Sequence, residues 1–452
     1  MVFLGWIYWG LISGIFFFLA IQFFWERNFV GGFKTMFVSV LFSLFYLPVL
    51  LRMKIPMQNW FILSIWILSL LFLLVLVIPS RKKSPNMIVS IQEQVDERDA
   101  LFHRFYRLKP GTPDFESYYH QHPEYKEIDD KIRALPDIAN PGAATYVPHI
   151  SPFALASMEM IDDLAKNVDW QPKPLGVEPV RAATEEITQR IKGYARYLGA
   201  ALVGTTGLNP AYIYSHVGRS PGRWGEPINL KHNFAIAIAV EMQHEMVRHA
   251  PENPTLTETS FQYLEAAKIA TVLARYIHLL GFRARAHVDA NYRVMCVPIA
   301  VDAGLGELGR LGLLITPEFG PRVRLAVVTT TMPLKQDSPK VFGVQHFCQL
   351  CKKCATYCPS QSIPFGEKEI VNGVEKWRSR QTSCYHYWRK KGTDCGICLR
   401  VCPYSYPNTA MHQMMRRIVQ RNQLARKAIY LGDRFFYGNP MKRRYPLPQW
   451  HR

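Results

Sequence analysis

Eight of the nine cysteines lie in two runs whose spacing is typical of iron–sulfur ligands. The first run has the pattern C-x2-C-x2-C-x3-C-P, and the second ends in C-x2-C-x3-C-P. In proteins with two cubane clusters, the fourth cysteine of such a run binds the other cluster. The spacing therefore predicts two interlocked [4Fe–4S] sites, called clusters A and B. Cluster A takes Cys348, Cys351, Cys354 and Cys402, and cluster B takes Cys358, Cys384, Cys395 and Cys398.

Disulfides and a zinc site are the competing uses of these cysteines. A zinc ribbon needs two C-x2-C pairs and has no place for a third spaced cysteine. Free thiols for cluster binding also indicate a reducing compartment. Cys296 belongs to neither run, and we expect it to be a buried core thiol.

Three apolar stretches near the amino terminus are long enough to cross a membrane. They cover residues 1–25, 35–51 and 55–80. A spanning helix needs about 20 apolar residues, with roughly 17 as the lower limit. No basic segment precedes the first stretch and no small-residue cleavage site follows it, so we expect an anchor instead of a cleaved signal peptide.

The positive residues in the short loops favour one orientation of this anchor. If the carboxyl side is cytoplasmic, the positive residues inside are Arg27, Lys34, Arg81, Lys82 and Lys83. The opposite orientation would place only Arg52 and Lys54 inside. Because positive loops stay on the cytoplasmic side, we expect a multi-pass inner-membrane protein whose soluble part faces the cytoplasm.

The soluble part alternates between helical and strand patterns from about residue 150. The clearest helix covers 257–280, with Thr257 or Thr259 as its cap and Gly281 as its stop. Continuous apolar runs at 201–204, 234–242 and 323–331 predict buried strands. Helices interspersed with such strands indicate an α/β domain. The predicted segments are an anchor (1–80), a connecting arm without a core (81–147), an α/β domain (148–340), a cluster domain (341–410) and a basic tail (411–452).

The tail concentrates part of the net charge of +19. It holds ten Lys or Arg residues, and Asp433 is its only acidic residue. On a domain tethered to a bilayer, such a tail is attracted to anionic headgroups. A nucleic-acid surface and a docking face for an acidic electron carrier are the alternatives.

A glycine turn precedes the third predicted strand, with Gly304, Gly306 and Gly309 in the order G-x-G-x-x-G. A dinucleotide site would need a following helix and an acidic residue about 20 positions on. Gly312 and Pro317 interrupt any such helix, and residues 324–334 contain no acid. The glycines therefore predict a close approach of the backbone to another group, and not a nicotinamide or flavin site.

Residues 301–334, followed at once by the first cysteine run, resemble corrinoid reductive dehalogenases. The resemblance extends back through AYIYSHVGR (211–219) and YIHLLGFRARAH (276–287), and it covers roughly residues 200–405. Epoxyqueuosine reductase, a tRNA-modifying relative, is similar in layout. The resemblance implies a nitroreductase-like α/β domain that holds base-off cobalamin, beside a ferredoxin-like domain with two [4Fe–4S] clusters.

Two features favour the dehalogenases over the tRNA enzyme. Glu307 and Arg310 after the glycine turn are the dehalogenase-like form, whereas the tRNA enzyme resembles G-L-G-W-x-G-K there. The tRNA enzyme is also soluble, while this chain has a membrane region. The chain departs from the respiratory dehalogenases, since it shows no twin-arginine signal and carries an anchor-like segment of its own. This departure puts periplasmic residence and the natural electron donor in question.

The resemblance also implies roles for individual residues. Tyr263 matches the proton donor, Arg324 the basic residue beside it, and Asn291 the polar residue of the pocket. A guanidinium near a phenol stabilises the phenolate, so we expect Arg324 to lower the pKa of Tyr263 toward the working pH. The residues expected to contact cobalamin are Tyr214, Ser215, His216, Gly304, Leu305, Gly306 and Gly309.

The resulting expectation is reductive dehalogenation of an organohalide at base-off cobalamin, fed by the two clusters. Tyr214 is the rival proton donor to Tyr263. The expected partners are the substrate, the lipid bilayer and an electron donor, which would be a ferredoxin, a flavodoxin or a membrane quinol oxidoreductase. Nucleic acid is not expected as a partner. The alternatives are epoxyqueuosine reduction in tRNA and a membrane electron-transfer subunit without a catalytic centre.

Overall fold

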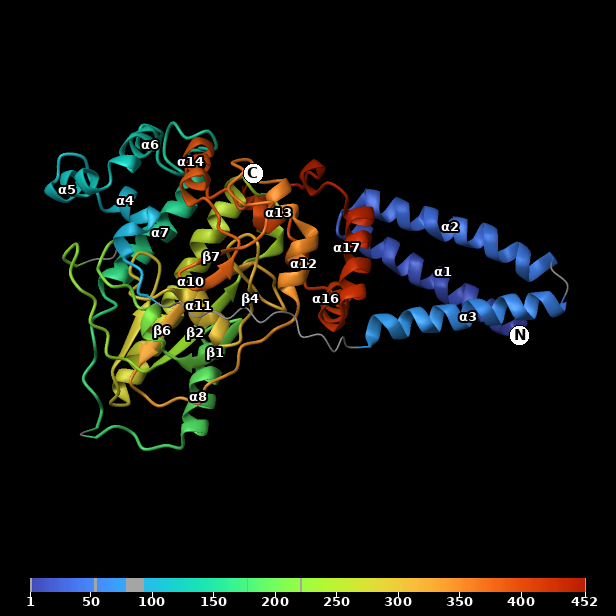
Figure 1. Ribbon diagram of the computed structural model, residues 1–452, viewed down its shortest axis with the longest axis horizontal. Coiled ribbons are helices and arrows are strands. Elements are labelled where there is room, and N and C mark those ends of the chain that lie inside the picture. Colours follow the sequence, from blue (N-terminus) through green and yellow to red (C-terminus); the bar gives the residue numbers. More distant parts are fainter. Residues whose placement is uncertain (1, 53–54, 79–92, 177, 220–221, 452) are drawn as a thin grey trace. The chain divides into compact units, whose positions relative to one another are not determined.

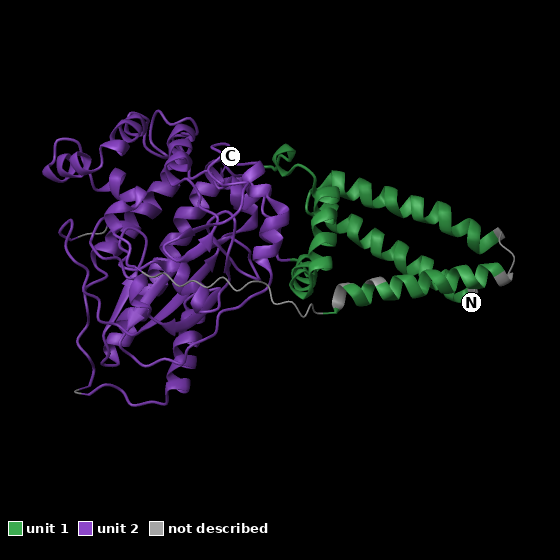
Figure 2. Cartoon of the chain, in the orientation of Figure 1, with its two compact units in different colours: residues 1–84, 409–446 green, residues 85–408, 447–452 purple. Residues whose placement is uncertain are grey.

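The computed structural model describes residues 2–52, 55–78, 93–176, 178–219 and 222–451. The chain forms two compact units, shown in different colours in Figure 2. Unit 1 consists of residues 1–84 and 409–446, and unit 2 of residues 85–408 and 447–452. The predicted tail is therefore not a separate segment, because most of it belongs to the unit that contains the amino-terminal helices.

Unit 1 contains three long apolar helices, α1 (Val2–Trp25), α2 (Phe29–Arg52) and α3 (Ile55–Val77). Each of them is long and apolar enough to cross a membrane, as predicted. Helix α2 begins six residues before the predicted stretch and includes both Lys34 and Pro48. Lys54, Arg81, Lys82 and Lys83, which entered the predicted orientation, lie outside the described residues. The carboxyl-terminal helices α16 (Ala410–Arg421) and α17 (Gln423–Tyr437) complete this unit.

Unit 2 is built on a four-stranded sheet (Figure 1). Its strands are β1 (Leu202–Gly207), β2 (Phe234–Glu241), β3 (Ala284–His287) and β6 (Val323–Thr330), in the order β1-β2-β6-β3. The three predicted strands are β1, β2 and β6, and every neighbouring pair is antiparallel. An antiparallel arrangement brings the end of β2 to the beginning of β6, where Glu241 pairs with Val323.

Helices cover both faces of this sheet. Helix α10 (Asn253–Leu279) packs on one face, with α7 (Ser151–Lys166) against it and α8 (Thr184–Tyr197) beside β1, and α11 (Cys296–Asp302) packs on the other. The two faces alternate along β2, because Ile236 and Ile238 join the core under α10 while Ala235 and Ala237 join the core under α11. The mixed α/β prediction is thus confirmed for this domain.

Helix α10 begins earlier than predicted. It starts at Asn253, with Pro254 in its first turn, so Thr257 and Thr259 lie inside the helix and do not cap it. It ends as predicted, since Gly281 follows it with φ +92°. This extra turn places Thr259 where it can contact the cluster domain.

The described part of the predicted connecting arm has a small core of its own. Helices α4 (Leu101–Tyr106), α5 (Pro113–Gln121) and α6 (Pro123–Arg133) are joined by buried polar contacts. Tyr119 donates a hydrogen bond to Asp129 over 2.8 Å, and Arg104 forms an ion pair with the same carboxylate at 3.2 Å. The expectation of an arm without a core is wrong, because aromatic residues of α5 pack together (Phe115, Tyr118 and Tyr119).

The remaining elements are short. Between α8 and the cluster domain lie α9 (His244–Val247), β4 (Glu307–Leu308) and β5 (Leu314–Ile315). The cluster domain contains α12 (Val344–Cys351), α13 (Lys353–Thr356), β7 (Glu369–Val371), β8 (Val374–Lys376), α14 (Gln381–Lys391) and α15 (Ile397–Arg400). Short 3-10 turns cover Glu97–Asp99, Pro210–Tyr212, Pro403–Ser405, Pro440–Lys442 and Gln449–His451.

Candidate active site and cluster ligands

A cavity of about 220 Å³ lies where β6 begins and is called the tyrosine cavity below. The amino-terminal half of α10, the start of α11, strand β5 and the loops that carry Tyr214, Tyr292 and Pro321 supply the rest of its wall. Three phenols, one thiol and one guanidinium are its polar side chains, and the other lining residues are apolar. The lining residues are Tyr214, Tyr263, Tyr292, Val294, Cys296, Val297, Leu313, Leu314, Pro321, Val323, Arg324 and Leu325.

The structure brings together the predicted donor and its basic neighbour. The guanidinium carbon of Arg324 lies 4.8 Å from the centre of the Tyr263 ring, a cation–π contact. Burial raises the pKa of Tyr263, and Arg324 lowers it by a smaller amount, so the pKa lies above its ordinary value. The expectation of a pKa lowered toward the working pH is wrong, because desolvation of the phenolate outweighs the nearby positive charge.

Arg324 is also held by Thr259 and Asp394. Its Nη2 donates to Thr259 Oγ1 over 2.9 Å and lies 3.5 Å from Asp394 Oδ2. Thr259 in turn donates to Asp394 over 2.5 Å. Asp394 directly precedes Cys395, a predicted ligand of cluster B. A continuous set of contacts therefore joins the phenol of Tyr263 to the cluster domain.

Two buried polar atoms at this site have no hydrogen-bond partner among the described residues, Arg324 Nε and Asp394 Oδ1. Burial raises the pKa of Asp394, and Arg324 lowers it by less. A buried donor without a partner is costly to a folded protein and is common where a ligand binds. Arg324 therefore has a free donor for a bound molecule.

Tyr292 and Cys296 line the cavity, although the sequence did not single them out for it. The pKa of Tyr292 is raised well above its usual value, first by burial and then by the carboxylate of Asp289. Asp289 accepts two hydrogen bonds from Arg219, at 3.0 and 3.1 Å, which holds the loop that carries Tyr292. Cys296 is only partly buried, so the predicted core thiol lies instead on a cavity wall.

Asn291 does not reach the cavity. Its Nδ2 donates to the carbonyl of Ala165 over 2.7 Å, and its Oδ1 accepts from Arg285 over 2.8 Å. The side chain is almost fully buried in these contacts. Asn291 therefore positions the segment before Tyr292, and its predicted place in the pocket is not supported by the geometry.

Of the residues expected to contact cobalamin, one lines the tyrosine cavity and the others make contacts within the chain. Tyr214 lines the cavity, whereas His216 pairs with Asp96 at 3.1 Å and Ser215 bonds to His216. In the glycine turn, a Cβ on Gly306 would lie 2.2 Å from the carbonyl oxygen of Ile315. The same turn brings Gly304 close to Ser338 and Gly309 close to Ile315, and Leu305 is buried in the core under α11. The close approach predicted for these glycines is thus an approach to the chain itself.

Cysteines of the same predicted set raise one another's pKa values, and Cys398 of the other set also raises that of Cys354. In cluster A, burial and then the thiols of Cys348 and Cys402 raise the pKa of Cys354. In cluster B, burial and then Cys384 and Cys358 raise the pKa of Cys398 to about 12. Thiols with raised pKa values are weak nucleophiles, but a bound metal deprotonates them.

One cysteine sulfur of the second set accepts a backbone hydrogen bond. Among the described residues, no group of three or more His, Cys, Asp or Glu side chains is arranged to hold a metal ion. The backbone N–H of Ser362 donates to Cys358 Sγ over 3.3 Å, as is typical of cluster sulfurs.

Arg310 lies beside cluster A. Its Nε donates to the carbonyl of Cys348 over 3.1 Å, and its Nη1 donates to Pro364 and Gly366 at 2.7 and 3.0 Å. The guanidinium is 1% exposed and stacks 4.3 Å from the ring of Trp377. A fixed positive charge therefore lies close to Cys354 and Cys348, two predicted ligands of cluster A.

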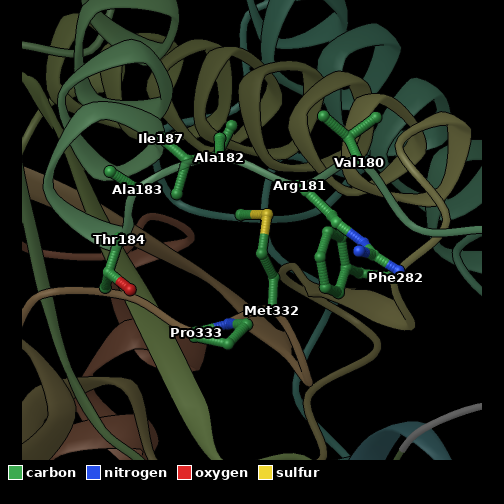
Figure 3. A pocket seen from close by; sticks show the side chains of 9 residues that line it. All are labelled: Val180, Arg181, Ala182, Ala183, Thr184, Ile187, Phe282, Met332 and Pro333. Atoms are coloured by element: carbon green, nitrogen blue, oxygen red, sulfur yellow. The ribbon is translucent and has the colours of Figure 1, made fainter.

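A second hollow, of about 480 Å³, is larger but lies away from this chemistry (Figure 3). Met332 and Pro333 in its wall follow the end of β6, whereas Arg324 lies near the strand's beginning. Eight residues of strand extend over roughly 25 Å, so the hollows are at opposite ends of β6. Its lining residues are Val180, Arg181, Ala182, Ala183, Thr184, Ile187, Phe282, Met332 and Pro333.

Comparison with known proteins gives two kinds of similarity. Residues 347–406 match the 4Fe-4S dicluster domain family. The tetrachloroethene reductive dehalogenase of Sulfurospirillum multivorans is 32% identical over 289 residues, which are 56% of this chain and 57% of that protein. The epoxyqueuosine reductase of Lactococcus garvieae is 30% identical over 132 residues, 26% of this chain and 36% of the reductase.

A solved structure extends this similarity over more of the chain. The catabolic reductive dehalogenase NpRdhA in complex with 3-bromo-4-hydroxybenzoic acid is 25% identical, with a TM-score of 0.64. The similarity covers 79% of this chain and 48% of that one. The chain thus spans about half the length of the relatives it matches.

Fold and cysteines together define the class: a mixed α/β domain joined to a 4Fe-4S dicluster domain. Within that class the chain is similar to reductive dehalogenases over more than half of its length and to epoxyqueuosine reductase over a shorter part, as residues 200–405 predicted.

Proposed function

We propose that the chain catalyses the reductive removal of halogen from an organohalide in the tyrosine cavity. The overall reaction consumes two electrons and one proton, replaces a carbon–halogen bond with a carbon–hydrogen bond, and releases halide. The observation that carries this proposal is the Tyr263–Arg324 pair in the cavity wall. Homology to reductive dehalogenases supports the reaction class.

Tyr263 is the proton donor in this proposal. Its raised pKa keeps the phenol protonated at neutral pH, so the proton stays available until the carbon accepts it. After transfer, the positive charge of Arg324 stabilises the phenolate at 4.8 Å from the ring. The contacts of Arg324 with Thr259 and Asp394 keep the guanidinium in that place.

Clusters A and B deliver the electrons. We assign their ligands as the two sets of four cysteines given above, which the mutual effects on thiol pKa values support. The donor to these clusters is proposed to be a ferredoxin, a flavodoxin or a membrane quinol oxidoreductase. Cluster B is the one whose ligand Cys395 adjoins the contacts of Arg324, so we place it next to the reaction centre.

The family implies a corrinoid beside the substrate, and the structure of one solved reductive dehalogenase suggests a mechanism for B12-dependent dehalogenation. When bound, base-off cobalamin supplies the reduced metal centre at which the carbon–halogen bond breaks. The cavity of about 220 Å³ suits the substrate beside such a group, and the unpartnered Arg324 Nε in its wall fits a bound molecule. The residues of this chain suited to contact it are Tyr214, Tyr292 and Cys296 in the wall and Arg324 through its free Nε.

The substrate is proposed to be a small hydrophobic organohalide. The volume lies below the roughly 300–1,000 Å³ of common ligand pockets, and most lining residues are apolar or aromatic. Relatives are named for tetrachloroethene, and one is solved with a brominated hydroxybenzoic acid. Both compounds are of this size class.

We also propose that the chain is anchored in the inner membrane with unit 2 in the cytoplasm. Three helices of unit 1 have the length and composition of membrane spans. The positive residues in their loops favour the cytoplasmic side for both unit 2 and the carboxyl terminus. A reducing cytoplasm also suits nine free cysteines.

Anaerobic purification with metal and corrinoid analysis tests the cofactor content. We expect about eight iron atoms and one cobalt per chain, since each cubane holds four irons. Iron without cobalt would support an electron-transfer subunit instead. Reduction of epoxyqueuosine in tRNA, without halide release from organohalides, would establish the reaction of the other relative.

A further inference from the structure

Helices α16 and α17 attach to the ends of the three apolar helices within unit 1. Asn422, between them, donates to the carbonyls of Val75 and Ile78 at the end of α3, each over 2.8 Å. Lys34 of α2 donates to the carbonyl of Phe435 over 2.7 Å. The turn from α1 to α2 and the carboxyl-terminal end of α3 lie at the same end of the three-helix bundle. Helices α16 and α17 therefore lie at one membrane surface.

A buried polar cluster fastens these helices to α1. Glu26, just after α1, accepts hydrogen bonds from His412 of α16 at 2.9 Å and from Tyr437 of α17 at 2.8 Å. The side chains of Glu26 and His412 are 8% and 6% exposed. The position of both helices at the bundle's end is therefore fixed by buried contacts and does not depend on loop conformation.

The outward faces of α16 and α17 combine apolar and positive side chains. On α16, Met414, Arg417 and Arg421 are exposed at helical spacing. On α17, Leu424, Lys427, Leu431, Arg434 and Phe435 are exposed on one face, with Leu424 and Leu431 58% and 62% exposed. Asp433, the only acidic residue of the segment 411–452, is buried.

This combination needs a partner that is both apolar and negatively charged. On α17 the exposed aliphatic side chains lie on the same face as the cations, and a nucleic acid would pair with the cations but leave these side chains in water. The boundary between headgroups and acyl chains meets both requirements when the headgroups are anionic. The position at the ends of the apolar helices places the face at that depth.

We propose that α16 and α17 form a binding surface for anionic phospholipids. Arg417, Arg421, Lys427 and Arg434 contact the headgroups, and Leu424, Leu431 and Phe435 enter the acyl boundary. This positive face lies at the same end of the bundle as the α1–α2 loop, which contains Arg27. Its cations therefore add to the positive charge that assigns this end to the cytoplasm. The proposal rests on the membrane placement proposed above and is independent of the reaction in unit 2.

The test uses the full-length protein in bilayers that contain phosphatidylglycerol and phosphatidylcholine in a ratio of about one to four. Spin-labelled analogues of each lipid report the relative association constant for the protein. We expect wild type to select phosphatidylglycerol. A variant with Arg417→Gln, Arg421→Gln, Lys427→Gln and Arg434→Gln should lose that selectivity, and 0.5 M salt, chosen to screen the charges, should weaken it in wild type.

A matched control removes the same charge from unit 2, at four exposed positions outside the catalytic machinery. Its changes are Lys109→Gln, Arg196→Gln, Lys231→Gln and Lys390→Gln. The control should keep the lipid selectivity of wild type, and both variants should keep wild-type halide release in detergent. Equal selectivity in wild type and the α16–α17 variant would overturn the proposal. Tight binding of tRNA by wild type, lost in that variant while lipid selectivity is unchanged, would assign the surface to nucleic acid.

Discussion

Replacement of Tyr263 by phenylalanine removes the proton donor and keeps the aromatic ring. The ring retains its packing and the cation–π contact with Arg324, because both depend on the π face and not on the hydroxyl. Binding of the clusters, the corrinoid and the substrate should therefore be unchanged. The expected effect is confined to the proton transfer step.

The size of the effect follows from the environment of the phenol. General acids contribute about 10²–10⁴-fold to rates. Burial raises the pKa of Tyr263, which makes it a weaker acid than a free phenol, so we expect the lower half of that range. Turnover should fall by about 10²–10³-fold, equivalent to roughly 3–4 kcal/mol of transition-state stabilisation.

The assay is halide release under anaerobic conditions with an artificial low-potential reductant. Tyr214→Phe is the matched control, since Tyr214 lines the same cavity, whereas the ring beside Arg324 is that of Tyr263. The control should disturb corrinoid binding more than turnover of the loaded protein. Normal turnover in Tyr263→Phe together with loss of turnover in Tyr214→Phe would refute the assignment of the donor.

Three further changes test other parts of the site. Arg324→Leu should reduce turnover less than Tyr263→Phe does. Because the guanidinium lowers the pKa of Tyr263, its removal raises that pKa. The alkaline decline of the pH–rate profile should therefore move to higher pH. If the alkaline decline of the pH–rate profile did not move, Arg324 would have no influence on the pKa of the proton donor. Cys354→Ala should remove cluster A, seen by electron paramagnetic resonance, and leave the signal of cluster B; loss of all iron would contradict two separable sites. Arg310→Met should shift the potential of cluster A to more negative values, because a buried positive charge favours the reduced cluster, while Arg310→Lys should shift it less. A potential unchanged in Arg310→Met, measured by redox titration, would show that the charge is screened.

The sequence predicted those elements of the fold whose residue patterns depend only on neighbouring positions in the chain. Strands β2 and β6 are continuous apolar runs and α10 is an amphipathic helix, so their patterns are visible without tertiary information. The start of α10 was not predictable, because Thr257 and Thr259 are both good cap residues. Thr259 instead bonds to Asp394, 135 positions away in the chain.

The candidate site was partly predictable for the same reason. Cysteine spacing is a local signal, so two sets of ligands could be predicted without tertiary information, and thiols within each set raise one another's pKa values. Tyr292 and Cys296 were missed because the cavity wall is formed by tertiary packing of α10, α11, β5 and β6 with the loops between them. Asn291 was assigned to the pocket from its place in the chain, but its side chain turns to Ala165 on α7. The pKa of Tyr263 depends on burial, which no sequence pattern reports.

Reaction stoichiometry is the decisive measurement for the proposed dehalogenation. Full-length protein, purified anaerobically and supplied with base-off cobalamin, would be given a small organohalide and a known amount of reductant. We expect one halide released and one carbon–hydrogen bond formed for every two electrons consumed, with deuterium in the product when the reaction runs in D₂O. Electron consumption without halide release would contradict the proposed reaction.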